Sequence, residues 1–121
     1  MLIETIRRAG RLGEAEVYRF ARARRFEETA VALSLLCEIE LDTVEQALHD
    51  RSHDMALVIA KVAGLSTTCA KAILLLKTAD RGISASDFDQ ALRTFEKLQP
   101  ETARRVIAFY RARVHPRAAQ A

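Results

Sequence analysis

The stretch His49-Asp50-Arg51-Ser52-His53-Asp54 is the one place in the sequence where side chains of metal-ligand type cluster. Two histidines four residues apart share a face if they lie on one helix, which is the spacing that helical zinc sites use. Ser52 between them is typical of a residue that begins a helix, so we expect the histidines to fall on different helices and lose that geometry. The stretch is therefore predicted to be a loop without a metal ion.

Other residue types that do chemistry give no catalytic pattern. Cys37 and Cys69 lie among leucines and alanines with no base nearby in the sequence, and apolar surroundings make a thiol unreactive. There is no CxxC pair, so we expect reduced core thiols, with a disulfide between them as the less favoured alternative. The four glycines are scattered rather than gathered in a phosphate-binding loop. An enzyme would need a pocket of convergent polar groups, which the sequence does not display, so we expect no catalysis and no cofactor.

Arginines gather on two predicted helices and provide the candidate interaction residues. These are Tyr18, Arg19, Arg22, Arg25, Arg104, Arg105 and Arg111. We expect all three arginines of the second group to point outward. Arginine can bind phosphates and stack on a base, so either face would suit a nucleic acid. However, the helix after Leu65-Ser66 is too apolar to be a recognition helix, and solvated or acid-paired arginines are the ordinary alternative.

The charges are ordered along the chain. The net charge is only +3, but residues 1–25 hold seven arginines against three glutamates. Residues 26–59 hold eight acidic side chains against one arginine, and residues 60–121 hold eleven basic side chains against five acidic ones. A nucleic-acid binder usually concentrates one sign of charge on one face. The basic, acidic, basic order therefore favours pairing within the molecule or between subunits at least as much.

The stretch 55–76 is the predicted centre of the fold. It reads as two enclosed helices folded back on each other, the second carrying Leu74, Leu75 and Leu76, with Gly64 ending the first and Ser66 capping the second. Polar residues interrupt this apolar run well short of the roughly 20 residues that cross a bilayer. We therefore expect a soluble chain without membrane insertion. The absence of a signal peptide at its start favours a cytoplasmic location.

Similar patterns predict helices over residues 2–9, 14–25, 27–39, 85–98 and from Pro100 to 114. Asp42 with Glu45 suggests a capping box for a short helix that fades near Asp50, and Ser52 and Ser84 are further expected caps. The fold class is therefore all-α, a multi-helix bundle or short α-solenoid of seven to eight helices built from helical hairpins. One domain is expected over 1–115, with a frayed tail at 116–121.

Residues 32–43 align with 56–67 at a constant offset of 24, and both pieces read as helix, tight turn, helix. Such similarity is what stacked helical hairpins leave in a sequence. A chance likeness between two amphipathic hairpins explains it equally well.

Several motifs resemble one protein family. They are Arg25-Phe26-Glu27-Glu28, Ala32-Leu33, the run Leu41-Asp42-Thr43-Val44-Glu45-Gln46-Ala47-Leu48, Leu57 to Ala60 with Gly64-Leu65-Ser66, Leu74-Leu75-Leu76 and Pro100-Glu101-Thr102-Ala103. From about Ile6 to Arg113, the chain looks like the C-terminal part of domain of unknown function 2336, an all-helical bacterial family whose longer members resemble HEAT-like helical repeat proteins. The resemblance implies a helical fold and a missing N-terminal portion, or else a short member. It supplies no activity and no functional residues.

The expected function is a helical interaction module that binds a protein partner or a second copy of itself. The observations behind this hypothesis are the hairpin similarity and the ordered charges. The alternative is a nucleic-acid-binding domain that uses Arg19, Arg22 and Arg25.

Overall fold

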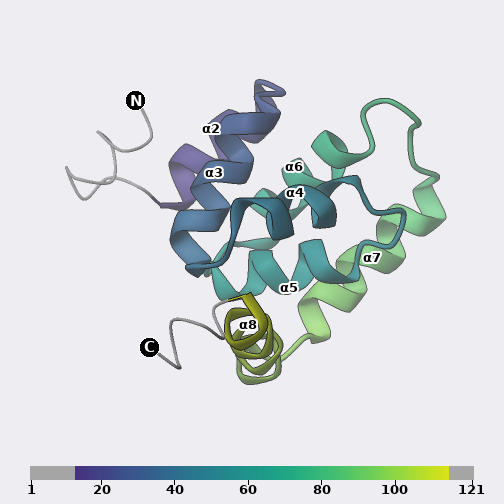
Figure 1. The fold of residues 1–121 in the computed structure, drawn as a ribbon. Coiled ribbons are helices and arrows are strands. Elements are labelled where there is room, and N and C mark those ends of the chain that lie inside the picture. The colour runs from purple at the N-terminus through teal and green to yellow at the C-terminus, as the bar shows by residue number, and fades with distance from the viewer. Residues whose placement is uncertain (1–12, 115–121) are drawn as a thin grey trace.

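A computed structural model describes residues 13–114, with side chains through Arg111. This part of the chain contains seven α-helices and no strand, which confirms the all-α prediction (Figure 1). The helices are α2 (Glu14–Arg22), α3 (Phe26–Cys37), α4 (Leu41–His49), α5 (Asp54–Val62), α6 (Thr67–Lys77), α7 (Ala85–Lys97) and α8 (Pro100–Val114). The helix expected over residues 2–9 and the tail expected over 116–121 lie outside the described residues.

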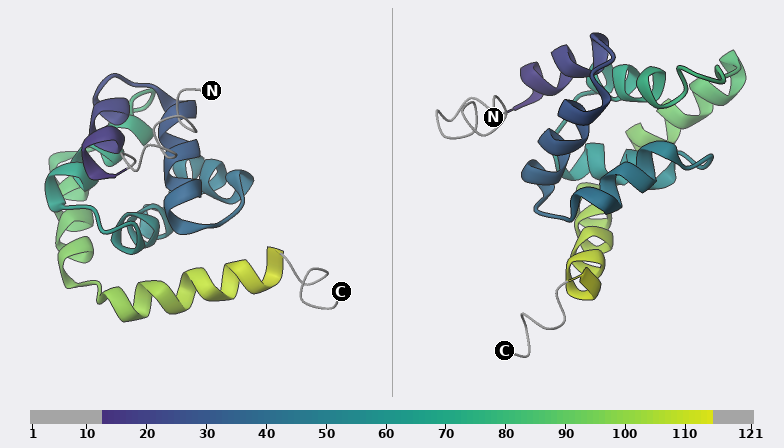
Figure 2. Two further views of the ribbon diagram at one scale, coloured as in Figure 1. Left: turned by 90° about the vertical axis from the view of Figure 1, so that its left-hand side faces the viewer. Right: turned by 45° about the horizontal axis from the view of Figure 1, so that its top comes forward.

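Helix α5 is the hub of the fold. It contacts α3, α4, α6, α7 and α8, and its most extensive packing is against α8, which runs along the lower edge of the left view in Figure 2. Helix α6 packs mainly against α2 and α7 and touches α5 only slightly. Helices α5 and α6 therefore do not pack closely on each other, although the sequence had suggested this for residues 55–76. They are joined by a tight turn, but each is covered by helices from elsewhere in the chain.

The core is built from apolar side chains of all seven helices. On α6, Ile73, Leu74 and Leu76 are buried, as predicted, but Leu75 is 54% exposed. The prediction that the whole leucine run is enclosed is wrong at this residue because α6 keeps one face, with Lys71 and Leu75 four residues apart, in solvent. Within residues 13–114, no helix combines the length and the apolar character that crossing a bilayer requires.

Three helices end in the same left-handed turn. A residue with positive φ follows the helix, and the next N–H donates to the carbonyl five residues back, which satisfies otherwise unpaired carbonyls. The positive-φ residues are Arg24 (58°), Glu38 (55°) and Gly64 (77°). The corresponding hydrogen bonds join the N–H of the following residue to a carbonyl: Arg25 to Phe20 (2.9 Å), Ile39 to Ser34 (3.2 Å) and Leu65 to Ala60 (3.1 Å). Only the glycine gave a signal in the sequence, so the helices expected to reach residues 25 and 39 end earlier, at Arg22 and Cys37.

Serine caps and proline begin the later helices as predicted. Ser66 Oγ accepts from the N–H of Cys69 (3.4 Å), and Ser84 Oγ accepts from that of Asp87 (3.0 Å). Pro100 is the first residue of α8.

The expected starts of α4 and α5 need correction. Helix α4 begins at Leu41, before Asp42, so the proposed capping box does not form. Ser52 Oγ accepts from the N–H of Asp54 (3.2 Å), but the residue at the cap position of α5 is His53.

Candidate functional site

The exposed side of α2 carries two shallow depressions that share Ala15 and Tyr18. One, of about 650 Å³, is lined by Ala15, Tyr18, Arg19, Arg22 and Ala23. The other, of about 370 Å³, reaches the start of α6 at Ser66, Thr68 and Cys69. We call these lining residues together the α2 surface. Three of the predicted interaction residues, Tyr18, Arg19 and Arg22, therefore belong to one continuous surface.

The arginines near the α2 surface already have partners. Arg22 Nη1 donates to the hydroxyl of Tyr18 (3.2 Å), and its guanidinium carbon lies 5.8 Å from the ring centre. The exposed Arg19 forms an ion pair with the half-buried Glu16 at 3.5 Å. Arg25 lies beyond the end of α2, immediately before α3, where it pairs with Glu28 at 2.7 Å. The structure therefore brings Tyr18 and Arg22 together and separates Arg25 from them.

The three predicted arginines of α8 have different environments. Arg104 and Arg105 are exposed, and Arg104 lies 3.6 Å from Glu101. Arg111 is half-buried, and its Nε donates to the carbonyls of Cys37 (3.1 Å) and Glu38 (3.3 Å) at the end of α3. The expectation that Arg111 points outward is wrong because the last carbonyls of α3 lack partners within their own helix and attract a cation.

Both cysteines are free and buried. Burial raises the pKa of Cys37 to about 11 and that of Cys69 to about 12. Cys37 Sγ donates to the carbonyl of Ile59 at 3.4 Å. Because the thiolate is the reactive form, neither side chain is a nucleophile near neutral pH.

The carboxylate of Glu14 links helix α2 to α6. The N–H of Ser66, the cap residue of α6, donates to Glu14 Oε1. This bond and a second one with the Ser66 side chain lower the pKa of Glu14. The contact fixes the edge of the α2 surface at the point where the two helices begin.

A second cluster surrounds Lys77, a residue that the sequence analysis did not single out. Lys77 is 7% exposed, and its ammonium donates to the carbonyls of Asp50 (2.7 Å) and Ser52 (3.4 Å). It also lies 2.9 Å from Nδ1 of His53. Arg81 Nη2 donates to the same Asp50 carbonyl at 3.1 Å. These contacts hold the loop of residues 50–53 on the C-terminal end of α6.

The environment of this loop shifts two pKa values downward. Burial, and then the positive charge of Arg81, lower the pKa of Lys77. Burial also lowers the pKa of His53, and the positive charges of Lys77 and Arg81 lower it further. The carboxylates of Asp87 and Asp54 oppose this shift. His53 is therefore held in its neutral form near neutral pH.

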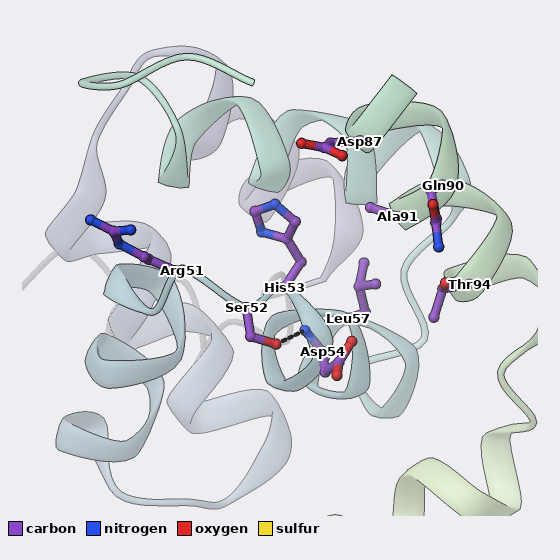
Figure 3. A pocket seen from close by; sticks show the side chains of 9 residues that line it. All are labelled: Arg51, Ser52, His53, Asp54, Leu57, Asp87, Gln90, Ala91 and Thr94. Carbon is purple, nitrogen blue, oxygen red and sulfur yellow. Dashed lines mark hydrogen bonds between the residues drawn. The ribbon is translucent and has the colours of Figure 1, made fainter. Parts of the chain in front are cut away.

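Two shallow grooves meet at His53, and we call them together the His53 groove. One, of about 380 Å³, includes Arg51, Arg81, Ser84 and Asp87 in its lining. The other, of about 340 Å³, includes Asp54, Asp87, Gln90 and Thr94. In the view of Figure 3, the imidazole stands between Arg51 on one side and the α7 side chains on the other.

The two histidines of the sequence cluster do not meet. His49 is the last residue of α4, where its ring stacks on Phe26 with the ring centres 4.6 Å apart, and His53 directly precedes α5. Among the described side chains, no group of three or more His, Cys, Asp or Glu is placed to hold a metal ion.

A family model described as "Uncharacterised protein conserved in bacteria (DUF2336)" matches residues 1–108. The chain belongs to the DUF2336 family. The match covers all the helices described above except the last part of α8. Comparison of this DUF2336 chain with curated proteins finds no match, and comparison with solved structures finds none.

Proposed function

We propose that this chain is a non-catalytic helical interaction module that binds a protein partner through the α2 surface. The supporting observation is that the two depressions are continuous at Ala15 and Tyr18, with Arg22 lining the larger one. Tyrosine and arginine, together with tryptophan, are enriched among the residues that contribute most to binding at protein interfaces. The hydrogen bond between them holds both side chains in place before binding, which reduces the entropy lost on association.

The charge pattern favours a protein partner over a nucleic acid. Arg19 and Arg25 are each paired with a glutamate three residues away, so carboxylates are interspersed among the arginines. A phosphate backbone would have to compete with these glutamates and would be repelled by them. A protein surface with both signs of charge can complement such a mixture. A second copy of the chain is one partner of this kind, since residues 26–59 are strongly acidic.

The test combines association with variants of the α2 surface. We expect light scattering or capture with an identified partner to detect a complex, and Tyr18→Ala and Arg22→Ala to weaken it by about tenfold or more each. Arg105→Ala, on the exposed side of α8, is the matched control and should leave the affinity unchanged. A strict monomer without a partner, or a complex insensitive to both α2 variants, would contradict the proposal.

The alternative is a nucleic-acid-binding domain. The Tyr18 ring with Arg22 above it provides a stacking platform of the type that binds unpaired bases. The alternative would be supported by binding to DNA or RNA that weakens steeply with salt and is lost when Arg19, Arg22 and Arg25 are replaced by glutamate. Absence of binding at low salt would eliminate it.

We also infer that the chain corresponds to the C-terminal region of longer DUF2336 members, that its hairpins are related to HEAT-like repeats, and that it is cytoplasmic. Support for the repeat relationship comes from the same left-handed turn at the ends of α3 and α5, each leading into the next helix. The structure of a longer member would test it: the helices preceding this region should continue the same pairwise arrangement.

A further inference from the structure

We propose that the His53 groove binds a small ligand through a phosphate or carboxylate group, with His53, Arg51 and Arg81 as the residues that hold the anion. This proposal is independent of the α2 surface. Its basis is the arrangement of hydrogen-bond donors around the groove.

The contact with Lys77 determines what His53 offers to a ligand. A lysine ammonium has only donors, so Nδ1 of His53, 2.9 Å away, must act as the acceptor. The ring is then neutral and carries its proton on Nε2. His53 consequently presents an N–H donor from its other nitrogen. Such a ring is a poor base, but it can hydrogen-bond an oxyanion.

Two guanidinium groups line the same groove as His53. Arg81 uses Nη2 to bind the Asp50 carbonyl, which leaves other donors of its planar group available. Arg51 forms no hydrogen bond or ion pair with any other residue in the described part of the chain. Asp87 is the only carboxylate side chain in the lining of this part of the His53 groove, so two cations face one anion here, while Asp54 lies in the adjoining part. Guanidinium groups match the oxygens of phosphates and carboxylates well, because they can donate two parallel hydrogen bonds.

The adjoining groove indicates the rest of the ligand. It carries Asp54, Asp87, Gln90 and Thr94, whose side chains are mainly acceptors for hydroxyl groups. Each groove, at 340 to 380 Å³, is at the small end of the range for ligand pockets. The chemical class that fits both is therefore a small hydroxylated anion, such as a sugar phosphate or a hydroxy acid.

The test is an NMR titration of the full chain at low ionic strength and constant pH near 7.5. The probes are inorganic phosphate, glycerol phosphate and citrate, each added to about 50 mM, with sodium chloride at matched ionic strength as the reference. We expect the Nε2–H signal of His53 and the backbone amides of residues 51–53 and 81–84 to shift saturably. Shifts with the phosphates alone would assign a phosphorylated ligand, and shifts with citrate alone would assign a carboxylate.

Variants separate a built site from general attraction of anions to a basic chain. Arg51→Gln, which removes no hydrogen bond or ion pair within the described structure, should weaken binding about fivefold or more, and so should Arg81→Gln. Arg93→Gln, an exposed arginine on α7 outside the groove, should leave binding unchanged. No saturable shift with any probe, or equal affinity in Arg51→Gln and the parent, would overturn the proposal.

Discussion

Lys77 Nζ lies 2.9 Å from Nδ1 of His53, a residue 24 positions earlier in the chain. The same ammonium also donates to two backbone carbonyls of the loop of residues 50–53. A protonated His53 could not accept from Lys77 and would face a second positive charge at short range. The contact between Lys77 and His53 therefore depends on a neutral imidazole.

The first prediction concerns pH. The pKa of His53 is lowered in the folded protein, while the unfolded chain keeps the ordinary value near 6.5. Below about pH 6.5, the unfolded chain therefore binds a proton that the folded ring does not, so the free energy of unfolding decreases as the pH falls. We expect urea denaturation to show this loss between pH 7 and pH 5. His53→Asn keeps an acceptor for Lys77 but does not titrate, so its free energy of unfolding should decrease less than that of the parent. Equal losses in parent and variant would contradict this role of His53.

The second prediction compares two adjacent leucines. Leu74 is 0% exposed and Leu75 is 54% exposed. Leu74→Asp should unfold the domain, because a charge without a partner in the core costs several kcal/mol of the roughly 5 to 15 available. Leu75→Asp places the same charge in solvent and should change the free energy of unfolding by less than about 1 kcal/mol. Circular dichroism during thermal melting measures both. Similar melting of the two variants would mean that the faces of α6 are wrongly assigned.

The third prediction concerns the left-handed turns. Arg24 and Glu38 adopt positive φ, a conformation that costs a residue with a Cβ about 1 to 2 kcal/mol. Arg24→Gly and Glu38→Gly should each stabilise the domain by about 0.5 to 1 kcal/mol in urea denaturation, after the greater backbone entropy of glycine in the unfolded chain is included. Ala23→Gly is the matched control. Ala23 has a φ of −82°, so this substitution relieves no strain, and the variant should lose stability through the backbone entropy of glycine.

The fourth prediction concerns Arg111. Arg111→Met keeps the aliphatic part of the side chain and removes the donors to Cys37 and Glu38. We expect a loss of about 1 to 3 kcal/mol in the free energy of unfolding, because partly buried carbonyls at the end of α3 lose their partner. Arg105→Met, on the exposed part of the same helix, should stay within about 0.5 kcal/mol of the parent. Equal stability of the two variants would show that the contact contributes nothing measurable.

Local signals in the sequence predicted the starts of the later helices correctly, but not those of α4 and α5. Ser66 and Ser84 begin helices because their hydroxyls accept from N–H groups of the first turn, and Pro100 does so because its fixed φ suits the first helical position. Gly64 was recognisable because its effect is equally local. Arg24 gave no signal, because a residue with a side chain adopts the left-handed region only when the surrounding packing compensates for the strain.

Tyr18 and Arg22 could be predicted together because they lie four residues apart on one helix, but the cluster around Lys77 and the position of Arg111 depend on contacts between distant residues, which sequence patterns do not contain. Lys77 looked like an ordinary lysine at the end of an apolar helix, yet its partners lie 24 to 27 residues away. Arg111 looked like a surface arginine, yet it binds a carbonyl 74 residues away. Both residues bind backbone carbonyls, groups that every residue carries and that no motif marks; Lys77 also contacts the ring of His53.

The pairing of α2 with α6 and of α5 with α8 has a consequence for how such a domain can change length. In an open array of repeats, each unit touches only its neighbours, so another unit can be inserted without loss. Here an inserted hairpin between α2 and α6, or between α5 and α8, would push apart helices that cover each other. Growth of this architecture is therefore restricted to its two ends.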